Sequence, residues 1–138
     1  QADGGTRTAS ITGGCVAVAI ALNRLLGTGG LTDFPLRKLV TAVSAGVYQG
    51  TPVLDLNYPE DKDATVDFNV VMTEDLEFVE VQGSGEEAVF SESEMQAMLE
   101  LCKSGISELA ALQRKAIIDA DTVDQTGLQS LGDVFKTS

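Results

Sequence analysis

Four short strand-like runs between positions 40 and 82 most constrain how this chain folds. They cover residues 40–48, 53–58, 66–72 and 76–82, and short polar or glycine-containing segments separate them. Connections this short join successive strands most readily in antiparallel order, so we expect an antiparallel meander. The third run has an apolar face opposite Asp67 and Asn69, which predicts a strand buried on one side.

Helical patterns flank these strands on both sides. The first begins near Thr8 or Ser10, ends at the glycine-rich residues 27–30, and is apolar nearly all round, which predicts a helix inside the domain. The second covers residues 91–116 and starts with a capping box, in which Glu94 follows Ser91 by three positions. We therefore expect an α+β fold in which an antiparallel or mixed sheet is packed with helices.

Composition limits the chemistry that the chain can perform. Acidic residues outnumber basic ones by 21 to 9, so this chain alone offers no basic surface for a nucleic acid. It has no histidine, and Cys15 and Cys102 lie far apart, which excludes a zinc site and a histidine-based triad. We expect two buried free thiols in a reducing cytoplasm. The longest apolar stretch, residues 15–22, is too short for the roughly 20 residues of a membrane span.

The first candidate site is the glycine-rich segment Gly4, Gly5, Thr6 and Arg7, directly before the first helix. Glycines let the backbone approach a ligand closely, helix-start N–H groups point at anions, and arginine offers a fork for phosphate oxygens. The segment is not a P-loop, because it lacks the Gly-Lys-Ser/Thr ending. It predicts a phosphate site or, more simply, a turn.

The second candidate site is the acidic loop predicted at residues 59–65, together with Asp67 in the next strand. Asp61 and Asp67 could meet where the loop joins the strand, and two carboxylates suit Mg²⁺ or general acid catalysis. The alternative is a solvated turn. A further polar group lies along the fourth run and is expected only to hinder pairing with another chain: Glu77, Glu80 and Gln82.

Ordered segments of this chain resemble bacterial ribonuclease PH, of the exoribonuclease PH and polynucleotide phosphorylase family. The similar segments are residues 1–13, 42–46, 54–61, 66–73, 80–83, 90–91 and 112–116. The resemblance covers residues 1–118 and implies a ribonuclease PH-like fold, of the ribosomal protein S5 domain 2 type, present as part of a domain. Residues 119–138 have no counterpart in the family and are expected to form a polar tail.

The resemblance implies a phosphorolytic 3′-to-5′ exoribonuclease, also called a tRNA nucleotidyltransferase, that trims tRNA precursors and releases nucleoside 5′-diphosphates. Gly5, Thr6 and Arg7 match the segment that binds the attacking phosphate. Asp61 and Asp67 match the catalytic carboxylates, which support Mg²⁺ or protonate the leaving 3′-oxygen. The family is cytoplasmic, acts in tRNA and rRNA processing, and forms a hexameric ring built as a trimer of dimers.

The chain departs from the family pattern in several places. The family's N-terminal half, with a further phosphate-contacting arginine and most basic residues that bind RNA, has no counterpart here, which reconciles an acidic chain with an RNA enzyme. Leu76 stands where glycine is common, and residues 83–87 differ from the usual loop. Two alternatives are a non-catalytic exosome-like ring subunit and a unit that only assembles with a separate N-terminal chain. Arg7 together with the two aspartates favours the enzyme.

Overall fold

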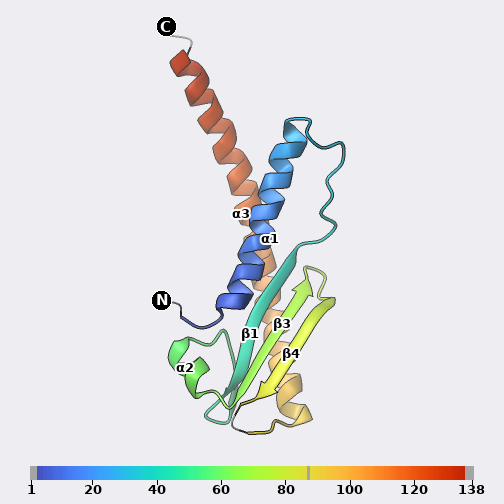
Figure 1. Cartoon of the computed structure of the whole chain (residues 1–138), viewed down its shortest axis with the longest axis vertical. Helices are drawn as coiled ribbons and strands as arrows, with labels where there is room; N and C mark the ends of the chain where they lie inside the picture. Colours follow the sequence, from blue (N-terminus) through green and yellow to red (C-terminus); the bar gives the residue numbers. More distant parts are fainter. Residues whose placement is uncertain (1–2, 87, 136–138) are drawn as a thin grey trace.

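The computed structural model describes residues 3–86 and 88–135, with side chains up to residue 120, and shows a four-stranded sheet with two long helices (Figure 1). In chain order the elements are α1 (Thr6–Gly27), β1 (Val40–Tyr48), β2 (Thr51–Leu54), α2 (Tyr58–Asp63), β3 (Val66–Thr73), β4 (Phe78–Gly85) and α3 (Glu92–Phe135). The predicted α+β class is confirmed.

The sheet is antiparallel throughout, but its strand order is β2-β1-β3-β4 rather than that of a meander. A tight turn at Gln49 and Gly50, both with positive φ, sends β2 back along one edge of β1. The predicted strand over 53–58 is wrong beyond Leu54, because the backbone turns at Asp55 (φ 55°) and leaves the sheet. The chain then crosses through α2 and returns as β3 on the other edge of β1.

The hydrophobic core lies between one face of the sheet and α3. On β3 the predicted alternation is confirmed, since Phe68, Val70 and Met72 are buried against the helix. From α3 the completely buried side chains are Met98, Cys102 and Ile106. We call the face of the sheet that packs against α3 the back face. The opposite face, which α3 does not cover, is the front face.

The cap of α3 forms as predicted, but the helix is longer than expected. Ser91 Oγ accepts a hydrogen bond from the Glu94 backbone N–H at 3.2 Å, and the Glu94 carboxylate accepts one from Ser91 N–H at 2.7 Å. The Ser91 backbone N–H and the Ser91 hydroxyl, which also donates to the carboxylate at 2.7 Å, favour the ionised form and lower the pKa of Glu94. The helix continues to Phe135, beyond the predicted end at 116, so most of the predicted polar tail is helical. Residues 136–138 of that tail lie outside the described residues.

Helix α1 starts at Thr6, earlier than predicted, and it lies along an edge of the sheet rather than inside the domain. Its side chains form hydrogen bonds with backbone groups of β1 in the part of that strand that does not pair with β2. Thr12 Oγ1 accepts from Ala42 N–H at 3.0 Å and donates to the Ala42 carbonyl at 3.1 Å, and Val40 N–H donates to Cys15 Sγ at 3.3 Å. The helix thereby covers an open strand edge.

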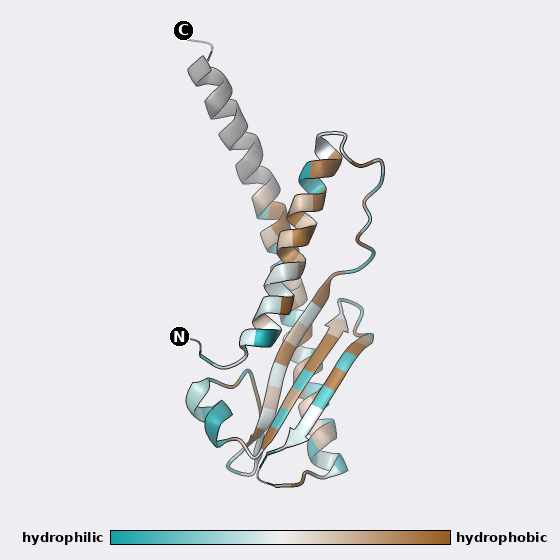
Figure 2. Ribbon diagram, in the orientation of Figure 1, coloured by the Kyte–Doolittle hydropathy of each residue, from teal (hydrophilic) through white to brown (hydrophobic). Residues whose placement is uncertain are grey.

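Much of the apolar surface of α1 is exposed, so the prediction that it is buried on nearly every side is wrong (Figure 2). Only Thr8 and Ala19 of this helix are buried. By length and mean hydropathy alone α1 is also long and apolar enough to cross a membrane, which corrects the expectation that the longest apolar stretch is too short. Its hydrogen bonds with β1 make it an element of this domain.

Candidate active site

Two glycines allow the chain to enter α1 close to the segment before α2. A Cβ atom on Gly4 would lie 2.2 Å from the Leu56 carbonyl oxygen, so only glycine fits there. Gly5 adopts the left-handed conformation (φ 66°), and no side chain caps the helix that begins at Thr6. The N–H groups of this first turn therefore lack a side-chain partner, which leaves them suited to an anion.

The side chain of Arg7 extends from α1 across the front face to β4. Its Nη1 donates to Gln82 Oε1 at 2.6 Å, and its Nη2 donates to Glu80 Oε1 at 2.5 Å in an ion pair whose two side chains are about half exposed. Neither Glu80 nor Gln82 was expected from the sequence to take part in a site. Their role depends on the register that places Gln82 opposite Asn69, and the sequence alone does not reveal that register.

The predicted acidic loop is in fact the short helix α2, which positions Asp61. Asn57 Oδ1 accepts from Glu60 N–H at 3.0 Å, and the Glu60 carboxylate accepts from Asn57 N–H at 3.0 Å, which completes a capping box. Asp3 accepts from the Tyr58 backbone N–H at 2.6 Å. This bond ties the segment before α1 to the start of α2, so the two candidate segments are held near each other.

Asp67 lies on the front face of β3, away from the core, as the alternation predicted. Partial burial raises its pKa above the ordinary value, and the negative charge of Asp61 raises it further. A hydrogen bond from Asn69 Nδ2, 2.8 Å from Asp67 Oδ1, acts in the opposite direction. Smaller opposing effects on this pKa come from the charges of Glu86 and Arg7. The carboxyl therefore retains a proton more readily than an exposed aspartate.

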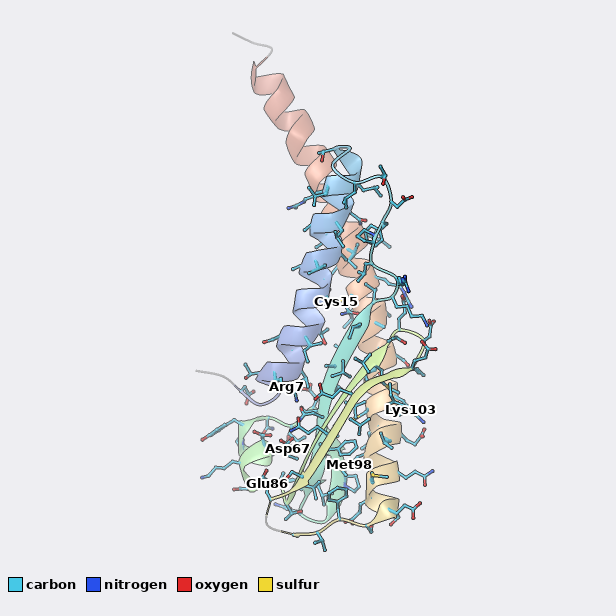
Figure 3. All side chains as sticks on the ribbon, turned by 45° about the vertical axis from the view of Figure 1, so that its right-hand side comes forward. Arg7, Cys15, Asp67, Glu86, Met98 and Lys103 are labelled. Atoms are coloured by element: carbon cyan, nitrogen blue, oxygen red, sulfur yellow. The ribbon has the colours of Figure 1, made fainter. Side chains whose placement is uncertain are left out.

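A cavity of about 300 Å³ gathers the predicted site residues, and we call it the front cavity. It is lined by Gly5, Thr6, Arg7, Ser44, Asp61, Asp67, Asn69 and Gln82. A second polar cavity, of about 370 Å³, adjoins it and is lined in part by Asp61, Asp67 and Glu86. Figure 3 shows Arg7, Asp67 and Glu86 on the side of the sheet away from Met98. All five residues predicted from sequence thus line one cavity.

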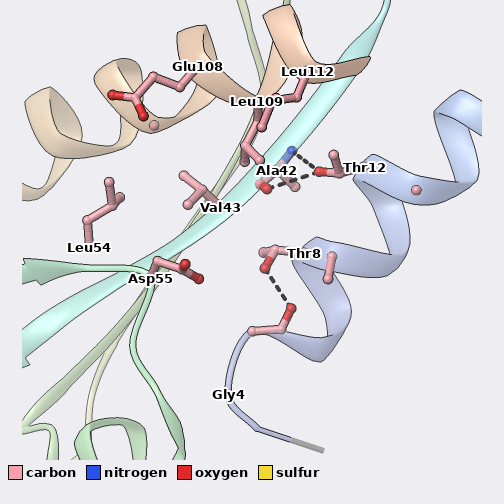
Figure 4. A pocket seen from close by; sticks show the side chains of 14 residues that line it. Gly4, Thr8, Thr12, Ala42, Val43, Leu54, Asp55, Glu108, Leu109 and Leu112 are labelled. Carbon is pink, nitrogen blue, oxygen red and sulfur yellow. Dashed lines mark hydrogen bonds between the residues drawn. The ribbon is translucent and has the colours of Figure 1, made fainter. Parts of the chain in front are cut away.

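A larger cavity, of about 570 Å³, lies between α1 and α3 (Figure 4). Its walls are mainly apolar and include Val43, Leu54, Leu109 and Leu112. Of the residues that line the front cavity, only Gly5 also lines this one. The two cavities are therefore lined by nearly separate sets of residues, and the carboxylates beside the larger one are those of Asp55 and Glu108.

The donor set of the front cavity fits a magnesium ion only in part. Within residues 3–86 and 88–120, no group of three or more histidine, cysteine or acidic side chains is placed to hold a metal. Asp61 and Asp67 provide two carboxylates, and Mg²⁺ is commonly bound by one or two carboxylates together with substrate phosphates and water. The pair therefore fits Mg²⁺ in combination with phosphate oxygens.

Two sequence comparisons relate this chain to known proteins. Residues 38–105 match the model of the 3′ exoribonuclease family, domain 2. Ribonuclease PH of Crocosphaera subtropica (strain ATCC 51142 / BH68) is 53% identical over 120 residues, which are 87% of this chain and 50% of that protein. The chain thus spans about half the length of this relative.

A solved structure shows the same fold at lower identity. The crystal structure of rice (Oryza sativa) Rrp46 has a TM-score of 0.63 and 22% identity, and the match covers 83% of this chain and 49% of that one. The predicted ribonuclease PH-like fold and the resemblance are both confirmed. Residues 38–105 thus resemble the second domain of the 3′ exoribonuclease family, and the chain is similar to the C-terminal half of bacterial ribonuclease PH.

Proposed function

We propose that the complete protein is a phosphate-dependent 3′-to-5′ exoribonuclease that trims tRNA precursors and releases nucleoside 5′-diphosphates. One observation carries the proposal. The front cavity brings an uncapped helix start and Arg7 together with Asp61 and Asp67, although these groups come from three separate elements. A non-catalytic ring subunit, the alternative raised by the sequence, has no need of this convergence.

In the proposed reaction, α1 and Arg7 hold the attacking phosphate. The first-turn N–H groups donate to phosphate oxygens from one side, while the planar guanidinium donates two parallel hydrogen bonds. Positive charge at this point offsets the repulsion between inorganic phosphate and the RNA phosphodiester, two anions that must approach each other. Gly5 permits the approach because it places no side chain at the start of the helix.

The two aspartates act on the leaving side of the bond. Because the pKa of Asp67 is raised by burial and by Asp61, Asp67 is suited to deliver a proton to the leaving 3′-oxygen. Asp61 and Asp67 would also be the residues that hold Mg²⁺, which when bound neutralises negative charge that develops on the reacting oxygens. In the first role the transferred proton, and in the second the bound cation, would offset the negative charge on the leaving oxygen.

We further propose that the complete protein works in the cytoplasm, away from membranes, as a hexameric ring built as a trimer of dimers. The resemblance implies this assembly. Large apolar side chains on the edge strand β4 support it, since Phe78, Val79 and Val81 are each about half exposed in the isolated chain. Basic residues that bind RNA are expected outside this acidic chain.

Substitution of Asp67 tests the proposal in the complete natural protein. Asp67→Asn is nearly isosteric and should preserve the fold, yet it should reduce phosphorolysis of a tRNA precursor by about 10²-fold or more, as for a lost general acid or metal ligand. The measurement is the release of nucleoside diphosphate with phosphate and Mg²⁺ present.

Asp63→Asn is the matched control, because Asp63 is exposed at the end of α2 and does not line the front cavity. We expect it to be close to neutral. Equal activity of the two variants would refute the catalytic assignment and leave the acidic segment as a solvated helix.

A further inference from the structure

Ser44 has a buried hydroxyl group without a hydrogen-bond partner. It lies in the middle of β1, and only 5% of the residue is exposed. Among the side chains that the structure describes, its Oγ is the one buried nitrogen or oxygen atom with no partner. Buried polar groups are nearly always hydrogen-bonded, so an orphaned hydroxyl requires an explanation.

The same strand shows what a purely structural hydroxyl does. Thr41, three residues earlier, is also fully buried, and its Oγ1 donates to Gln113 Oε1 at 2.8 Å. Gln113 in turn donates to the backbone carbonyls of Thr12 and Val40, each at 2.9 Å. Every member of that network has a partner within the domain, whereas the Ser44 hydroxyl has none.

The location of Ser44 indicates a ligand. Its side chain lines the front cavity together with Thr6, Arg7 and Asp67. A Cβ atom built on Gly5 would lie 3.3 Å from Ser44 Oγ, so the start of α1 lies directly over the hydroxyl with no side chain between them. An anion bound to the first-turn N–H groups would therefore be within reach of Ser44.

We propose that Ser44 is a phosphate-binding residue, whose Oγ–H donates to an oxygen of the attacking phosphate held at the start of α1. This inference rests on the proposed function and adds a donor from the floor of the cavity. The helix start approaches the anion along the α1 axis, and Arg7 approaches it from across the front face. A neutral hydroxyl suits this position, since it can donate to an anion without forming an ion pair with Asp61 or Asp67.

Removal of the hydroxyl has opposite consequences for stability and for binding. Ser44→Ala deletes a buried polar atom that the phosphate-free protein leaves unpaired, so the thermal midpoint should not fall. The same change should raise the phosphate KM about tenfold, the loss expected for one hydrogen bond to a charged group, with little change in kcat. Ser44→Cys keeps the volume with a weaker donor and should be intermediate.

The experiment measures phosphate KM, kcat and the thermal midpoint with and without inorganic phosphate, in the complete natural protein. Ser10→Ala is the matched control, because Ser10 is exposed on α1, donates to the Thr6 carbonyl at 2.7 Å and does not line the cavity. Arg7→Ala is the positive control. The proposal predicts a raised phosphate KM and weaker thermal protection by phosphate for Ser44→Ala, with Ser10→Ala unchanged.

The possible outcomes separate this inference from the function on which it rests. If Arg7→Ala raises the phosphate KM and Ser44→Ala does not, the role of Ser44 is refuted and the exonuclease proposal stands. A lowered thermal midpoint with an unchanged KM would make Ser44 structural and would also refute it. If the unsubstituted protein degrades RNA without needing phosphate, both proposals fail together.

Discussion

The two faces of the sheet differ sharply although the same strands build both. On the back face, α3 covers an apolar surface, and Phe68, Val70 and Met72 of β3 are almost fully buried. On the front face, Asp67 and Asn69 of the same strand line a polar cavity. The two-residue period of a strand makes this division possible, because neighbouring residues point to opposite sides. The packed side fixes the backbone from which the polar side chains project.

Substitution of Phe68 should give the largest effect on stability and should act through the back face alone. Phe68→Ala removes a completely buried ring and should lower the free energy of unfolding by about 3–5 kcal/mol. Urea denaturation of the complete protein measures it.

Phe34→Ala is the control, since Phe34 is 40% exposed in the segment before β1. Phe34→Ala should lower the free energy of unfolding by about 1 kcal/mol or less. Comparable losses for the two variants would show that the back face is not the core of the domain.

Substitution of Arg7 should give a large effect on the front face without destabilising the back face. Arg7→Ala should raise the phosphate concentration needed for half-maximal activity by about 10–100-fold, because it removes a charge-assisted fork. Arg7→Lys should also be poor, since a point charge does not reproduce two parallel hydrogen bonds. Initial rates over a series of phosphate concentrations test this.

Arg37→Ala is the corresponding control, because Arg37 is exposed between α1 and β1 and lines none of the cavities described above. Its phosphate dependence should match that of the unsubstituted protein. An unchanged phosphate dependence in Arg7→Ala would remove Arg7 from the site.

The smallest effect should be a pH-dependent change of stability at Asp67. Because the folded-state pKa of Asp67 is raised, its contribution to stability is present below the ordinary value of 3.8 and is lost as the pH rises through the raised pKa. Asp67→Asn should therefore raise the thermal midpoint at pH 7 by a small amount, and this advantage should shrink as the solution is acidified. Thermal scans between pH 3 and pH 7 test the sign. A midpoint lowered at pH 7 would contradict it.

Sequence reasoning succeeded where a local pattern determines the structure. The strand over residues 40–48 and the cap at Ser91 were predicted correctly, because turn residues, alternation and capping boxes act over a few positions. The helix α2 was missed, although Asn57 and Glu60 carry the same capping signal. There Asn57 and Tyr58 were interpreted as the end of a strand and the acidic residues 59–65 as a loop.

The remaining differences depend on contacts between distant segments. Strand order and register place Glu80 and Gln82 beside Arg7, and they leave Ser44 facing the start of α1. Neither arrangement has a local signature. Likewise, the apolar periodicity of α1 shows that the helix has an apolar surface, but it does not show whether another element packs against that surface. The exposure of the apolar side chains of α1 was therefore not predicted. The roles of the individual site residues stay predictions until the substitutions are measured.

The contact of Arg7 with Glu80 has a consequence for how rapidly the site can work. In the structure the Arg7 guanidinium already binds the Glu80 carboxylate and the Gln82 amide oxygen, so a phosphate ion that enters the front cavity must replace them. Binding is thus an exchange of one oxyanion for another, and its net free energy is the difference between two similar interactions. The returning Glu80 side chain can likewise displace the phosphate-bearing product. In the proposed reaction such an exchange would give modest phosphate affinity and fast release, as a site that must be emptied after each nucleotide requires.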